Sequence, residues 1–158
     1  MRRLMAAIVS ILAFAFASTN LGQAVERKIA QLRGTLTESN YPEFEKFVDD
    51  HVGKVIGLKI IVERTGSDAA PLQASADNGQ LVVYLKSTPD EPSESEIVAG
   101  NGFTYHNGSY VIDGLFIVKN SGMHQGVVSY SLKETNESAT KLDPSIKLEQ
   151  IELGKESQ

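Results

Sequence analysis

Cysteine is absent from this chain of 158 residues. That absence excludes a disulfide framework, a thiol nucleophile and lipid attachment to an N-terminal cysteine. Many small exported domains rely on disulfides, so this chain must be stabilised by core packing and backbone pairing alone. Its length suits one domain that buries a core without covalent staples.

Basic residues are few. The chain has 15 Lys and Arg against 20 Asp and Glu, which gives a formal net charge of −5, and it contains no Lys/Arg-rich run. Affinity for nucleic acid depends on neutralising phosphates, and attraction to anionic membranes depends on the same cations. The composition therefore predicts no nucleic-acid partner.

Histidine is also scarce. His51, His106 and His124 fall on a predicted helix end, a hairpin and a turn, far from the short spacings of a zinc site. A positive group beside a helix C-terminus is favoured by the helix dipole, which accounts for His51. The sequence therefore predicts no metal ligands.

Signatures of nucleophilic catalysis and of cofactor binding are missing as well. No Gly-x-Ser-x-Gly elbow occurs, and the Ser-x-x-Lys match at residues 138–141 lacks the partner motifs of the enzymes that use it. The Gly-Asn-Gly at residues 100–102 is not followed by the Lys of a phosphate-binding loop. We predict no catalytic and no cofactor-binding residues.

The N-terminus carries the clearest targeting signal. Arg2 and Arg3 precede an apolar run over residues 4–17, and small and polar residues follow up to Ala24. This order predicts a signal peptide over residues 1–24, cleaved after Ala24 or, as the less favoured site, after Ala17. The run is shorter than the ~20 residues that span a bilayer, so no stable membrane insertion is expected after cleavage. A buried N-terminal helix or a short uncleaved anchor is the alternative.

A strand, a helix and a second strand are predicted in succession. Apolar and polar residues alternate over 29–37 and again over 54–64, as in half-buried strands. Between them, Asn40, Pro42 and Glu43 predict a capped helix over about 41–52, which Gly53 ends. This order predicts a parallel β-α-β crossover.

The remainder is rich in strand and turn signals. A strand over 81–85 follows a turn at 77–79, and residues 87–96 form an exposed acidic loop. The strongest hairpin signal is Asn107-Gly108. A two-residue turn at this position fixes which residues of the two flanking strands pair with each other. The predicted pairs are His106 with Ser109, Tyr105 with Tyr110, Thr104 with Val111, and Phe103 with Ile112.

Three further features complete the predicted order. A strand continues over 115–118, residues 119–122 turn the chain, and Val128, Tyr130 and Leu132 mark the last strong strand. Residues 146–148 offer an edge strand within an otherwise polar tail. The predicted division is a signal peptide (1–24), one β-rich domain (25–133) and a polar C-terminal tail (134–158).

The predicted fold class is mainly β (α+β). We expect a mixed or antiparallel sheet, or a small barrel, of about six to seven strands with one covering helix. No family resemblance is specific enough to name.

The hairpin carries the candidate interaction surface. Period-two alternation places Phe103, Tyr105 and Tyr110 on one face, where they could form an aromatic platform for a ligand. His124 would join this surface if its turn lies at the same end of the sheet. The alternative is a cross-strand aromatic pair that only stabilises the hairpin.

The sequence thus favours an exported, periplasmic or secreted, non-enzymatic module that binds a protein, peptide or glycan. One alternative is a small extracytoplasmic hydrolase whose residues converge only in three dimensions, with His106 or His124 beside Asp113. Another is a homo-oligomer built through an exposed edge strand.

Overall fold

The computed structural model describes residues 27–88, 90–135 and 145–155. The predicted signal peptide and the Ser-x-x-Lys match lie outside these residues. Within them the chain forms one nine-stranded sheet and one helix, so the mainly β class is confirmed. No helix in this described part is long and apolar enough to cross a bilayer.

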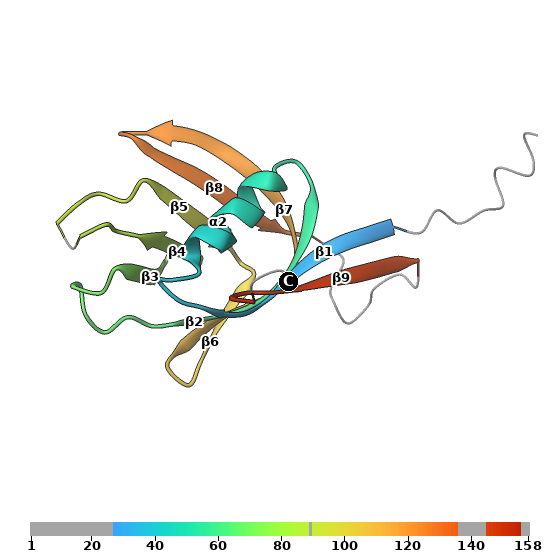
Figure 1. The fold of residues 1–158 in the computed structure, drawn as a ribbon, viewed down its shortest axis with the longest axis horizontal. Helices are drawn as coiled ribbons and strands as arrows, with labels where there is room; N and C mark the ends of the chain where they lie inside the picture. The colour runs from blue at the N-terminus through green and yellow to red at the C-terminus, as the bar shows by residue number, and fades with distance from the viewer. Residues whose placement is uncertain (1–26, 89, 136–144, 156–158) are drawn as a thin grey trace, which may run out of the picture.

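The sheet is mixed and open, with β3 and β9 at its edges (Figure 1). Its strand order is β3-β4-β5-β8-β7-β2-β1-β9, and β6 pairs with β7 beside this path. Strand β1 is parallel to β2 and β9, and β5 is parallel to β8; the other pairs are antiparallel. The elements are β1 (Arg27–Leu36), α2 (Tyr41–Asp50), β2 (Val55–Glu63), β3 (Leu72–Asp77), β4 (Gln80–Leu85), β5 (Ser95–Gly100), β6 (Phe103–His106), β7 (Ser109–His124), β8 (Val127–Glu134) and β9 (Ile146–Glu152).

The strand count is larger than the predicted six to seven because the sequence pattern did not reveal β3 and β5. Strand β5 also shortens the predicted acidic loop, since Ser95 and Glu96 already belong to it. The edge strand at residues 146–148 extends to Glu152 and pairs with β1 over its whole length.

The β1-α2-β2 unit has the predicted parallel crossover, with Gln31 opposite Gly57. The predicted capping box does not form, however. The Asn40 side chain accepts a hydrogen bond from the Thr37 amide and donates one to the Thr35 carbonyl. The Glu43 carboxylate instead accepts from the amide of Gly154. Both residues therefore brace neighbouring segments rather than the first turn of the helix.

Helix α2 lies against one face of the curved sheet (Figure 1). Its buried face consists of Tyr41, Phe44, Phe47 and Val48. These side chains meet inward-facing residues of the strands, including Leu58, Ile60, Leu81, Ile97, Ile112, Phe116 and Leu132. A single core thus sits between the helix and this inner face of the sheet.

Strand β7 is long enough to pair with three other strands. Its first part pairs with β2 on one side and with β6 on the other, and its second part pairs with β8. Residues 119–122, predicted as a turn, lie within β7 and contain a bulge between Asn120 and Gly122. The chain reverses instead at Gln125-Gly126, where both residues have positive φ (50° and 82°). The two ends of β7 are therefore far apart.

Candidate functional site

The aromatic hairpin has the predicted pairing, from His106 opposite Ser109 to Phe103 opposite Ile112. Its aromatic face turns mainly toward the core. The Tyr110 side chain is only 8% exposed and belongs to the core cluster, while Tyr105 is 54% exposed. The rings of Phe103 and Tyr105 pack on Tyr110 with centroid distances of 6.1 and 5.3 Å. This arrangement is a cross-strand aromatic cluster with only Tyr105 at the surface.

His124 does not join this hairpin. Tyr110 stands near the first residue of β7 and His124 is its last residue, so roughly 45 Å of strand separates them. Asp113 is likewise distant from both candidate histidines. Along β7 it lies four residues from Ser109, the partner of His106, and eleven residues from His124. The structure therefore brings together neither the proposed four-residue surface nor the suggested His–Asp pairs.

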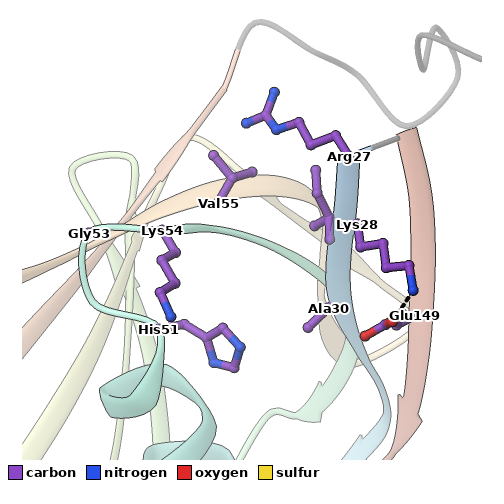
Figure 2. A pocket seen from close by; sticks show the side chains of 9 residues that line it. Arg27, Lys28, Ala30, His51, Gly53, Lys54, Val55 and Glu149 are labelled. Carbon is purple, nitrogen blue, oxygen red and sulfur yellow. Dashed lines mark ion pairs between the residues drawn. The ribbon is translucent and has the colours of Figure 1, made fainter. Parts of the chain in front are cut away.

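The structure instead reveals a pocket of about 500 Å³ where β1 begins beside the end of α2. Figure 2 shows that its lining residues come from β1, the α2–β2 turn and β9. We call it the basic pocket. Its lining consists of Arg27, Lys28, Ile29, Ala30, His51, Gly53, Lys54, Val55 and Glu149.

The turn between α2 and β2 places His51 and Lys54 at the pocket. Gly53 adopts φ +81°, a left-handed conformation that glycine tolerates, and its amide donates a 2.8 Å bond to the Val118 carbonyl. The turn is thereby fixed to β7. Lys54 follows immediately, at the entrance to β2.

His51 is held by two contacts with the last turn of the helix. Its Nδ1 lies 2.6 Å from the Phe47 carbonyl oxygen, and its ring is 4.4 Å from the Phe47 ring. Because a carbonyl only accepts, Nδ1 carries the hydrogen and Nε2 is the nitrogen left for another partner. A histidine bonded to a helix C-terminal carbonyl agrees with the structural role predicted for His51.

The charges in the basic pocket are mostly positive. Arg27, Lys28 and Lys54 line the pocket with one carboxylate, Glu149. The Glu149 Oε1 lies 3.7 Å from Lys28 Nζ, whereas the Lys54 side chain runs toward His51 and the Arg27 side chain points away from Glu149 (Figure 2). Both side chains of this ion pair are more than half exposed, so it contributes little stability. The nearby Asp50 carboxylate is bonded to Lys46, and that hydrogen bond lowers its pKa. The pocket thus concentrates positive charge in an acidic chain.

Sequence reasoning missed this pocket because its residues come from three separate segments. Arg27 and Lys28 alone do not indicate a pocket, because polar residues are common at exposed strand ends. Glu149 is brought near them only by the parallel pairing of β9 with β1. His51 and Lys54 were the only local signal, since they stand on either side of Gly53, which ends the predicted helix.

The pocket can bind an anionic group through charge and N–H donors. Among the described residues, no group of three or more His, Cys, Asp or Glu side chains is arranged to hold a metal ion. Comparison of this chain with protein-family models, curated proteins and solved structures finds no match.

Proposed function

We propose that this protein is an exported, non-enzymatic binding module, and that the basic pocket holds an anionic group of its ligand. The observation that carries the proposal is the local excess of positive charge. Two lysines, one arginine and one carboxylate line the pocket, although the whole chain has a formal net charge of −5.

A carboxylate is the ligand group we favour. Lysine ammonium groups act as point charges that do not require a particular shape of anion. The Nδ1–H of His51 is already bonded to the Phe47 carbonyl, so the lysines rather than the histidine would hold the carboxylate. The only carboxylate that pairs with Lys28 within the described residues is Glu149, and that exposed pair is weak enough for a ligand to displace.

Both an acidic peptide and an acidic glycan carry this chemistry, and two probes separate them. Tetraglutamate represents the peptide, and an oligogalacturonate represents the glycan. Each is titrated into the ¹⁵N-labelled protein at low ionic strength, because salt screens contacts between exposed charges. We expect the amide resonances of residues 27–30 and 51–55 to shift. The probe that binds more tightly then shows whether the ligand is an acidic peptide or an acidic glycan.

Lys54→Glu is the decisive variant, and Lys59→Glu is its matched control. Lys59 is an exposed lysine on β2 that is not part of the basic pocket, and its replacement changes the net charge equally. Lys54→Glu is expected to weaken binding by about tenfold or more, whereas Lys59→Glu leaves it within about twofold. Equal losses in both variants, or no shift with either probe, would overturn the proposal.

A further inference from the structure

A second hollow, of about 510 Å³, lies on the outer face of the sheet, away from α2. It runs over β5 and β8. We call this hollow the serine groove. The polar lining residues used in the argument below are Gln80, Glu96, Asn101, Ser129, Ser131 and Lys133.

Strand alternation explains why polar side chains meet there. Ile97 and Ala99 of β5 point into the core, so Glu96, Val98 and Gly100 point outward. The parallel register places Glu96 opposite Ser129, Val98 opposite Ser131, and Gly100 opposite Lys133. Because Gly100 has no side chain, the floor of the groove is left open near Lys133 and Gln80.

The protein leaves these polar groups available. Within the described part of the chain, the side chains of Gln80, Glu96, Ser129 and Ser131 make no hydrogen bond or ion pair with another residue. Serine hydroxyls both donate and accept, and the Gln80 amide does the same. A ligand rich in hydroxyl groups can replace the water on this surface with equivalent hydrogen bonds.

Charge in the groove is balanced. Glu96 lies at one end and Lys133 four residues along the ladder, roughly 13 Å away. The groove therefore favours neither anions nor cations, unlike the basic pocket. We propose that the serine groove binds a neutral, polyhydroxylated ligand, namely a segment of an uncharged oligosaccharide.

Hydrogen bonding, rather than stacking on an aromatic ring, would carry this binding. The outward aromatic residue of the neighbouring strand β4 is Tyr84, which pairs with Glu96. Lys86 Nζ lies over the Tyr84 ring, 5.7 Å from its centroid, and so occupies that ring face. We therefore expect millimolar affinity, because each exchanged hydrogen bond contributes only modestly.

The test is an NMR titration of the ¹⁵N-labelled full protein with maltotriose, cellotriose and N,N′,N″-triacetylchitotriose, each at concentrations up to tens of millimolar. At least one probe should shift the amides of β5 and β8 and leave those of residues 51–55 unchanged. The double variant Ser129→Ala/Ser131→Ala should weaken that binding about tenfold. Ser75→Ala is the matched control, since Ser75 is exposed on β3 and is not part of the groove.

Each outcome decides the proposal. Loss of binding in the double variant but not in Ser75→Ala supports it. The absence of shifts in β5 and β8 with all three sugars, or an equal effect of Ser75→Ala, overturns it. Lys54→Glu should leave sugar binding intact, so the groove can be rejected or accepted independently of the basic pocket.

Discussion

The hydroxyl of Tyr130 on β8 donates a 2.7 Å hydrogen bond to Oδ1 of Asp49 near the end of α2. Tyr130 is only 6% exposed, whereas Asp49 lies at the surface. Near the other end of the helix, the Tyr41 hydroxyl lies 3.5 Å from Ser95 Oγ on β5. Two polar contacts thus supplement apolar packing in fixing the helix on the sheet.

Tyr130→Phe removes the bond to Asp49 while keeping the ring in the core. We expect the free energy of unfolding to fall by about 1–2 kcal/mol, since a hydrogen bond to a charged group contributes more than a neutral one. Urea denaturation measures the change. Tyr84→Phe is the control, because no hydrogen bond of its hydroxyl is found within the described residues. Equal losses in the two variants would contradict the role of the Asp49 bond.

Alkaline pH should weaken the fold through the same tyrosine. The hydrogen bond to Asp49, helped by burial, raises the pKa of Tyr130 from 10.0 to about 12. Burial also raises the pKa of Tyr41. The folded protein therefore holds these protons more tightly than the unfolded chain does, so this stability is complete below pH 10 and is lost as pH rises toward 12.

Urea denaturation over that alkaline range checks the prediction. Tyr130→Phe should show a shallower loss of stability with pH than the unmodified protein, although Tyr41 still contributes. Parallel pH profiles for the two proteins would argue against coupling between Tyr130 and Asp49.

Gly102→Ala should be costly for steric reasons. A Cβ at this buried position would lie 2.6 Å from Cζ of Phe116, whose ring fills the core. Overpacking of this kind costs about 1–3 kcal/mol. Gly100→Ala provides the comparison, because a Cβ there meets nothing within 4 Å. Thermal unfolding should separate the two variants clearly, and similar midpoints would mean that Phe116 moves aside freely.

Tyr105→Ala and Tyr110→Ala should differ although the residues face each other across the hairpin. Truncating the buried Tyr110 ring should cost about 3 kcal/mol or more, because it leaves a cavity in the core. Truncating the exposed Tyr105 should cost under about 1 kcal/mol. Denaturant midpoints test this, and comparable losses would show that Tyr105 carries more packing than its exposure suggests.

The elements that the sequence predicted well are those encoded by local chemistry. Asn107 and Gly108 both take positive φ, as a two-residue hairpin requires, and the predicted pairing of β6 with β7 is confirmed. Strands β3 and β5 were missed because each buries only one large apolar side chain, Leu72 in β3 and Ile97 in β5. Ala74, Ser95 and Ala99 give almost no hydrophobic alternation, although the neighbouring strands bury all three.

The misplaced turn has a comparable cause. Residues 119–122 do contain turn chemistry, since the Asn120 side chain accepts a 2.8 Å bond from the Gly122 amide. That bond stabilises a bulge inside β7, because continued pairing with β8 outweighs the local preference for a turn.

The basic pocket could not be predicted from local sequence for a related reason. It depends on β9 lying beside β1, a pairing between the two ends of the described chain.

That same pairing sets the order in which a growing chain can complete its fold. Strand β1 is synthesised before every other strand described, yet both of its neighbours, β2 and β9, come later, and β9 comes last. A chain interrupted before Ile146 would leave one side of β1 as an open edge, able to pair with other unfinished chains. The C-terminal strand therefore acts as the closing element, which protects β1 only after synthesis has passed Glu152.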